Sequence, residues 1–482
     1  MWHRNFFLLS LTITLTTLAV TSTRADSAPS SISNFESVFA TLREKAKANS
    51  ADLKLQDSQV KQKTAGRYSS FSKFLPRVDA SINQSTSKDY SLLTGGTFGA
   101  LLGPQYSPTE MTLKKWSIQA SAPLFRKSVL VQSQVASDEY DEAVLKLSTV
   151  KKELYLKLRQ TLGQFLLAGY QFQLLQNSLG VTKRQSEEIN AGFRLGQKTS
   201  LDVLKNEAAL KTLEAQVALR LQEKLKAYQN LLDFLGIDEG ELTSLDLLAR
   251  ANDSNWISAT FQGFVGTENS IQSLRSSEFT RWITLSDKPE NFFRELQKAE
   301  APSLRLLDIQ RQLQISRVSQ TTVSEWPELS LQGSLSKQAD NWSTALSSNN
   351  TSYSYGIFLT IPIFSWGGGI ATFLDERSAK ITAETSFEKS KRSFTYELLN
   401  QARYLTALQV SVEAQKAALI QQEEIVRLSQ KSLDLGRATL TELLTSQKEL
   451  LDAKIQVSKG QLDLYIATLK FGQDLGFQQE EL

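Results

Sequence analysis

The sequence predicts an α+β membrane protein built from two internal repeats, each with a pair of β-strands and a long helical hairpin. In each half, prolines bound segments of alternating polarity, and a glycine later interrupts a long helical stretch. The distance from Pro123 to Gly196 is 73 residues, and the distance from Pro362 to Gly436 is 74 residues. Such close agreement over so long a span predicts one continuous rigid element in each half, because loops tolerate changes in length.

The N-terminus has the pattern of a secretory signal peptide, which we assign to residues 1–25. Arg4 precedes an apolar stretch over residues 6–20, and small residues lead to a cleavage site after Ala25. The apolar stretch is too short for a helix that spans a bilayer. No later segment is apolar over enough residues to form such a helix, so any crossing of a membrane is expected to use strands.

The composition is unfavourable for catalysis. His3, the single histidine, is lost with the signal peptide, and the chain has no cysteine. This excludes disulfides, Cys/His zinc sites, thiolate nucleophiles and imidazole-dependent triads, as well as a lipid attached to cysteine. We therefore expect no enzyme, no metal and no cofactor. A carboxylate-dependent hydrolase is a remaining alternative, but no paired acids form a recognisable pocket motif.

The charges of the mature chain nearly cancel. Removing two arginines with the signal leaves 52 basic and 51 acidic side chains, a formal balance of +1. This balance gives no reason to expect nucleic acid as a partner.

The first repeat, residues 26–240, is predicted to contain a helix over about 35–74, a strand pair over 76–123 and a helical hairpin with its tip near Gly196. Apolar and polar residues alternate after Pro76 and again before Pro123. The period of two predicts strands that have one apolar face and one polar face. The apolar positions are Val78, Ala80 and Ile82 in one strand and Trp116, Ile118, Ala120 and Ala122 in the other.

The second repeat, residues 290–482, follows the same order, with a strand pair over 327–362 and a hairpin tip near Gly436. Its apolar strand positions are Leu329, Leu331 and Leu335, then Tyr353, Tyr355, Ile357, Leu359 and Ile361. Between the repeats, residues 241–289 lack a clear period. We interpret them as an equatorial segment packed around the middle of the helical body.

Two-faced strands of this length are compatible with a soluble sandwich or with a membrane barrel. The helices favour the barrel. No proline occurs over residues 126–190, and some sixty-five helical residues would extend roughly 100 Å at ~1.5 Å per residue. Apolar residues spaced by three and four predict coiled-coil packing of antiparallel helices. Four strands cannot close a barrel, whereas three copies would supply about twelve.

The chain resembles the TolC family of outer-membrane channels over nearly all of its mature length. The resemblance depends on an ordered set of motifs in both halves. These are Leu75-Pro76, Pro123-Leu124-Phe125, Pro362-Ile363-Phe364 with Trp366-Gly367-Gly368-Gly369, and the paired tips Leu195-Gly196-Gln197-Lys198-Thr199-Ser200-Leu201-Asp202 and Leu435-Gly436-Arg437-Ala438-Thr439-Leu440-Thr441-Glu442.

The resemblance implies a homotrimer that forms a twelve-stranded β-barrel in the lipid of the Gram-negative outer membrane, continuous with a coiled-coil α-helical barrel in the periplasm. It implies a passive exit duct of a tripartite efflux pump or a type I secretion system. A periplasmic adaptor (membrane fusion) protein would open the duct at its helical tip and couple it to an inner-membrane transporter. The alternative is that the chain is itself a periplasmic adaptor or a coiled-coil scaffold without a pore.

The family also suggests functional residues. Asp202 and Glu442 would form a pore constriction, although Thr199-x-x-Asp202 and Thr439-x-x-Glu442 also fit capping boxes, in which the acid completes the start of a helix. The two roles are compatible. Gly196 and Gly436 are expected to end helices with positive φ. The predicted adaptor-docking residues are Leu195, Gly196, Lys198, Leu435, Gly436 and Arg437, and the predicted membrane-interface aromatics are Tyr90, Trp116, Tyr353 and Tyr355.

Overall fold

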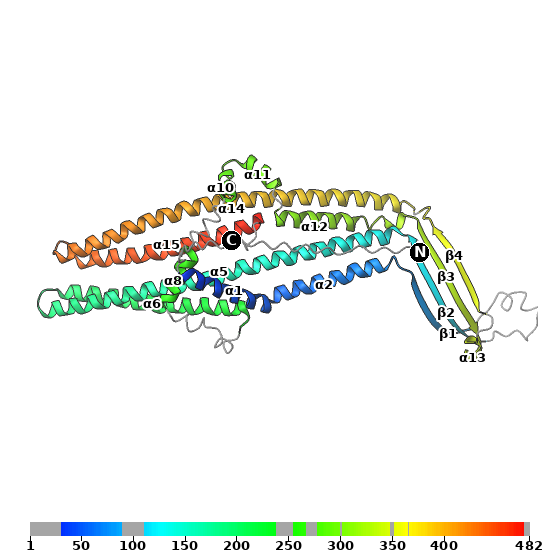
Figure 1. The fold of residues 1–482 in the computed structure, drawn as a ribbon, viewed down its shortest axis with the longest axis horizontal. Helices are drawn as coiled ribbons and strands as arrows, with labels where there is room; N and C mark the ends of the chain where they lie inside the picture. The colour runs from blue at the N-terminus through cyan, green and yellow to red at the C-terminus, as the bar shows by residue number, and fades with distance from the viewer. Residues whose placement is uncertain are drawn as a thin grey trace, which may run out of the picture.

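The computed structural model describes residues 30–88, 110–237, 254–266, 277–298, 301–347, 351–364 and 366–476. The signal peptide and Tyr90 lie outside these residues. The molecule is elongated, with two helical hairpin tips at one end and a β-sheet at the other (Figure 1).

The two halves of the chain have corresponding elements. The first half contains α1 (Ser30–Asn49), α2 (Ala51–Ser72), β1 (Arg77–Lys88), β2 (Glu110–Phe125), α5 (Lys127–Arg194) and α6 (Ser200–Leu235). The second contains α12 (Pro302–Val318), the 3-10 turn η2 (Val323–Glu325), β3 (Glu328–Ala339), α13 (Trp342–Ala345), β4 (Ser352–Thr360), α14 (Gly368–Asp434) and α15 (Leu440–Leu475). Between them lie α8 (Ser254–Gly266), α10 (Ser277–Leu285) and α11 (Pro289–Lys298), near the middle of the helical body (Figure 1).

The helix predicted over 35–74 is interrupted at Ser50, so the expectation of one helix there was wrong. Ser50 has non-helical backbone angles, and its hydroxyl oxygen accepts a hydrogen bond from the Leu53 N–H at 3.2 Å. The preceding Asn49 donates from Nδ2 to the carbonyls of Leu235 (2.9 Å) and Gly236 (3.2 Å). Asn49 thereby satisfies carbonyls at the end of α6 that the helix itself leaves unpaired. This contact between distant segments accompanies the break.

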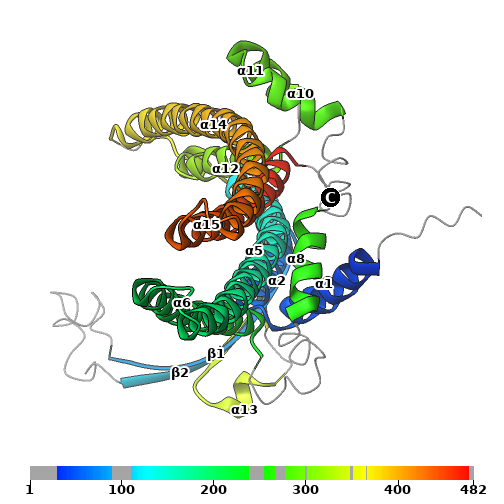
Figure 2. The same cartoon turned by 90° about the vertical axis from the view of Figure 1, so that its left-hand side faces the viewer.

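The long helices form a curved wall in which α6, α5, α15 and α14 lie side by side when viewed from the tips (Figure 2). Short helix α8 packs on this wall where α5 meets α15. Tyr170 of α5 stacks on Phe261 with ring centroids 5.0 Å apart, and Tyr465 of α15 lies 4.7 Å from Phe264. Gly163 lets these helices approach, since a Cβ there would lie only 2.6 Å from Leu462 Cδ1.

A second apolar cluster attaches α10 and α11 to the outside of α14. Both short helices are amphipathic, and their apolar sides supply Trp282, Phe292 and Leu296. These side chains pack with residues of α14 and α15 that include Leu398 and Phe471. Burial of large apolar side chains contributes about 1.5–3 kcal/mol each, so the two clusters stabilise the middle of an otherwise thin body.

Candidate functional site

The four strands form one antiparallel sheet in the order β1-β2-β3-β4. Directly paired residues lie on the same face of a sheet. The pairing of Ile82 with Trp116, of Ile118 with Leu335, and of Leu335 with Tyr353 therefore collects the predicted apolar positions of all four strands on one face.

The opposite face is rich in hydroxyl groups. Ser81 and Ser117 are hydrogen-bonded across β1 and β2 at 2.8 Å, and Ser334 and Ser354 across β3 and β4 at 2.9 Å. The alternation read from the sequence thus extends in register across the whole sheet.

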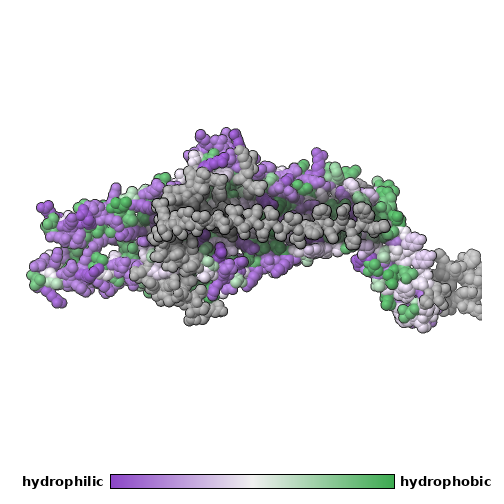
Figure 3. Space-filling view, viewed as in Figure 1, coloured by the Kyte–Doolittle hydropathy of each residue, from purple (hydrophilic) through white to green (hydrophobic). Residues whose placement is uncertain are grey.

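The apolar face is largely uncovered. Tyr355 is 82% exposed, and among the described residues no second sheet lies over it. The other exposed apolar side chains of this face are Val78, Ile82, Ile118, Leu331, Leu335, Tyr353, Ile357 and Leu359. Apolar surface is visible on the sheet and on the adjoining helix ends in Figure 3. A soluble sandwich would bury this face, so its exposure indicates an apolar partner.

The predicted interface aromatics have different environments. Tyr353 and Tyr355 are exposed and stacked, with ring centroids 6.5 Å apart and planes 7° from parallel. Trp116 is half-buried, and its Nε1–H donates to the carbonyl of Ala345 in α13 at 2.6 Å. This contact could not be predicted from the sequence, because it joins residues 229 positions apart.

Gly196 and Gly436 end the two long helices in the same way, as expected. Their φ angles are 74° and 68°, in the left-handed region that favours glycine. The N–H of Gln197 donates to the Gly192 carbonyl, and that of Arg437 to the Ser432 carbonyl, each at 2.8 Å. These bonds close both helix ends and turn the chain into the returning helix.

Both predicted capping boxes are present. Asp202 accepts from the Thr199 N–H at 3.0 Å and from the Thr199 hydroxyl at 2.8 Å, and Glu442 accepts from the Thr439 N–H at 3.1 Å. The backbone hydrogen bond from Thr199, aided by its hydroxyl and by nearby lysines, lowers the pKa of Asp202. Asp202 is therefore charged at neutral pH.

The turns between the paired helices present apolar and basic side chains to solvent. Leu195 is 73% exposed and Leu435 is 70% exposed, and Lys198 and Arg437 beside them are also exposed. A hydrogen bond that the sequence does not predict links the two hairpins: Lys205 Nζ donates to Thr441 Oγ1 at 3.0 Å. Only the relative positions of α6 and α15 reveal it.

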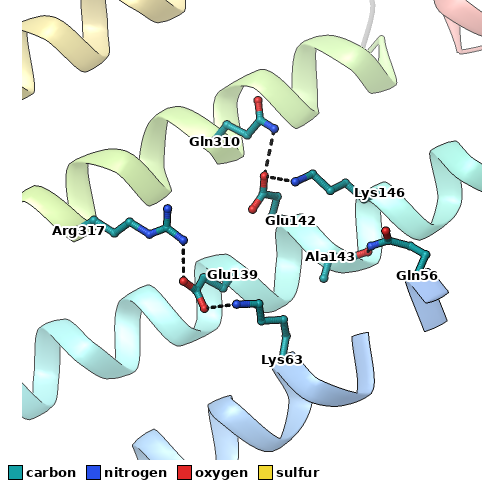
Figure 4. A network of polar contacts seen from close by, with 8 residues as sticks. All are labelled: Gln56, Lys63, Glu139, Glu142, Ala143, Lys146, Gln310 and Arg317. Atoms are coloured by element: carbon teal, nitrogen blue, oxygen red, sulfur yellow. Dashed lines mark hydrogen bonds and ion pairs between the residues drawn. The ribbon is translucent and has the colours of Figure 1, made fainter. Parts of the chain in front are cut away.

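Acidic residues of α5 connect three helices nearer the sheet (Figure 4). Glu139 forms ion pairs with Lys63 of α2 at 2.8 Å and with Arg317 of α12 at 2.7 Å. One turn away, Glu142 pairs with Lys146 at 2.7 Å and accepts from Gln310 at 3.0 Å. Burial opposes the charge of Glu139, but the hydrogen bonds from Lys63 and Arg317 outweigh it and lower the pKa.

Two features are absent from the described residues. No group of three or more His, Cys, Asp or Glu side chains in that part of the chain could hold a metal ion. No helix there combines the length and the apolar character needed to cross a membrane.

Comparison with known proteins identifies the family. The profile of the outer membrane efflux protein family matches residues 42–237 and 294–476, and the chain belongs to this family. It is 19% identical to the outer membrane protein TolC of Vibrio cholerae over 380 residues, which cover 78% of this chain and 79% of the relative. The resemblance found in the sequence is thus confirmed.

Solved structures share the fold. The Campylobacter jejuni CmeC outer membrane channel matches with a TM-score of 0.70 and 14% identity, over 92% of this chain and 87% of that one. The outer membrane protein VceC of Vibrio cholerae matches with a TM-score of 0.71 and 13% identity, over 94% of this chain and all of the other. As a member of this family, the protein is located in the Gram-negative outer membrane, with its helical body in the periplasm.

Proposed function

We propose that the protein is a passive exit duct, in which three copies close a twelve-stranded barrel through the outer membrane and a helical tunnel below it. The observation that carries this proposal is the two-faced sheet with two free edges. Among the described strands, β1 pairs only with β2, and β4 only with β3. An edge strand in lipid leaves its N–H and C=O groups unsatisfied, so the sheet must be closed by other copies.

Helices on the two sides of the subunit support the same closure. In the half of the body near the sheet, contacts run in the order α2, α5, α12 and α14, so α2 and α14 lie at opposite ends. Between α2 and α5 is a groove of about 660 Å³ lined partly by Tyr68, Phe71 and Tyr140. On the opposite side of the subunit, the end of α14 near the sheet exposes Phe373 and Leu374. These surfaces suit a ring in which α14 of one copy packs on α2 of the next.

The tips are the proposed docking site for a periplasmic adaptor protein, which would couple the duct to an inner-membrane transporter of a tripartite efflux pump or type I secretion system. Exposed Leu195 and Leu435 supply apolar contact area, and Lys198 and Arg437 supply charge beside it. No chemistry is assigned to the protein. Its role is to conduct cargo that the transporter selects.

Two measurements test the duct. The purified protein should require detergent and have the mass of three chains, and it should conduct ions as discrete single channels in planar bilayers. A water-soluble monomer without conductance would refute the proposal and would favour a periplasmic scaffold.

A ring of carboxylates from Asp202 and Glu442 is the proposed constriction, because three copies would bring six of these side chains around one axis. Asp202→Asn combined with Glu442→Gln removes the charge while an amide oxygen can still accept the capping hydrogen bond. Divalent cations should block the double variant less than the native channel. As a control, Glu188→Gln removes a charge from α5 outside the hairpin turn. Unchanged block in the double variant would count against the constriction.

A further inference from the structure

The apolar face of the sheet ends beneath the short helix α13, at the end of the strands away from the helical body. Trp116 and Lys337 are paired across β2 and β3, one row beyond Ile118 and Leu335 and on the same face. Helix α13 lies at the end of the sheet away from the helical body (Figure 1) and contacts both strands. Residues 341–347, which follow β3, thus fold back onto the apolar face.

Lys337 is buried by this segment, with only 7% of its surface exposed. Its Nζ donates to the carbonyl of Ser347 at 2.7 Å and to the Ser347 hydroxyl at 2.6 Å. A lysine facing hydrocarbon is costly unless its ammonium group is hydrogen-bonded or reaches the interface. The cover over Lys337 supplies such hydrogen bonds, as a lysine next to the hydrocarbon requires.

The covering segment has its own local structure. Asn341 caps α13 by accepting from the Thr344 N–H at 2.8 Å, and Trp116 anchors its end through the Ala345 carbonyl. Leu346, which directly follows α13, is 69% exposed. Trp342 at the start of α13 is half-buried, so the segment has apolar side chains of its own beside the sheet.

We propose that residues 341–347 form a membrane-interface anchor, which lies against the outer surface of the sheet at the level of the lipid headgroups. The hydrogen bonds of Trp116 and Lys337 hold it there, and Leu346 enters the boundary between headgroups and acyl chains. Aromatic and amphipathic side chains are stable at this boundary. The partner is a lipid surface, and the inference rests on the proposed function, in which the apolar face meets lipid.

Because the chain has no cysteine, single-cysteine variants can carry one spin label each. We would label Leu346→Cys in the anchor, Ile357→Cys on the apolar face of β4 and Leu204→Cys at the exposed start of α6, in vesicles of phosphatidylethanolamine with a minor fraction of phosphatidylglycerol. The measured quantity is the ratio of collision rates with dissolved oxygen and with a water-soluble nickel chelate. This ratio rises as a label moves into the hydrocarbon.

We expect the collision ratio to be highest for the label at Ile357, intermediate at Leu346 and lowest at Leu204. A Leu346 ratio equal to that of Leu204, with Ile357 still high, overturns the anchor and leaves the duct standing. A Leu346 ratio equal to that of Ile357 overturns the placement at headgroup level. A low ratio at Ile357 as well overturns the proposed function itself.

Release of the anchor gives a second test. Trp116→Phe combined with Lys337→Met, introduced into the Leu346→Cys protein, removes the side-chain hydrogen bonds that hold α13. The ratio at Leu346 should fall toward the value at Leu204, while Ile357 labelled in the same background keeps its value. Lys114→Met, on the same face in the next row outward, is the matched control and should leave the Leu346 ratio unchanged. A Leu346 ratio that stays intermediate after the double change would overturn the role of these bonds.

Discussion

Replacing Gly163 by alanine tests the junction of α5, α8 and α15. The added methyl group would lie 2.6 Å from Leu462 Cδ1 and 3.0 Å from Phe264 Cε1. Both neighbours are buried in the larger apolar cluster, so they cannot move aside freely. Overpacking of this kind costs about 1–3 kcal/mol, against a gain of about 0.5–1 kcal/mol from the better helix preference of alanine.

Gly180 supplies the matched control in the same helix. Nothing lies within 4 Å of a methyl group at that position, so Gly180→Ala should have only the helix gain of about 0.5–1 kcal/mol. The predicted gap between the two variants is therefore the packing cost alone, about 1–3 kcal/mol in favour of Gly180→Ala.

The assay is guanidinium unfolding of the detergent-solubilised protein, followed by the circular dichroism of the helices. Midpoints are compared in one detergent and at one protein concentration, because assembly makes the midpoint depend on concentration. If Gly163→Ala resists unfolding as well as Gly180→Ala, the close contact of α8 and α15 with α5 does not exist as described.

Two further outcomes are expected. Since the folded pKa of Glu139 lies below its ordinary value of 4.5, its ion pairs stabilise the fold above that pH, and this stability is lost as pH falls through the folded pKa. The melting temperature of Glu139→Gln should thus be lower than native at neutral pH and converge with it in acid; a constant difference would contradict the linkage. Lys205→Met removes the link to Thr441, so the channel should open more often in planar bilayers, whereas Lys211→Met, elsewhere on α6, should not change its opening. If the two variants open equally often, the hydrogen bond between Lys205 and Thr441 does not help to keep the channel closed.

Local patterns in the sequence predict much of this structure because their causes are local. Alternation of polarity predicts which side of each strand is apolar. It assigned Ile118 and Tyr353 to the apolar sides of their strands, and the strand pairing places both on one face of the sheet. The glycines at the hairpin turns and the Thr199 box each depend on bonds that span a few residues. Such features follow from local backbone geometry and from side chains a few residues apart.

Contacts between distant segments could not be predicted from local patterns in the sequence. The break at Ser50 accompanies the capping of α6 by Asn49, which lies 186 residues from Leu235. The ion pairs of Glu139 with Lys63 and Arg317 require the register of three helices. The burial of Lys337 depends on a short helix that no period of hydrophobicity predicts.

The two edge strands of the sheet, β1 and β4, have a consequence for the effect of a mutant allele. In the proposed ring each subunit joins its neighbours through both β1 and β4, so one subunit with a damaged margin leaves a gap beside normal partners. If a cell made equal amounts of normal and damaged chains that mixed at random, only about one assembly in eight would contain three normal copies. A damaged allele on a plasmid should therefore be dominant over the chromosomal copy.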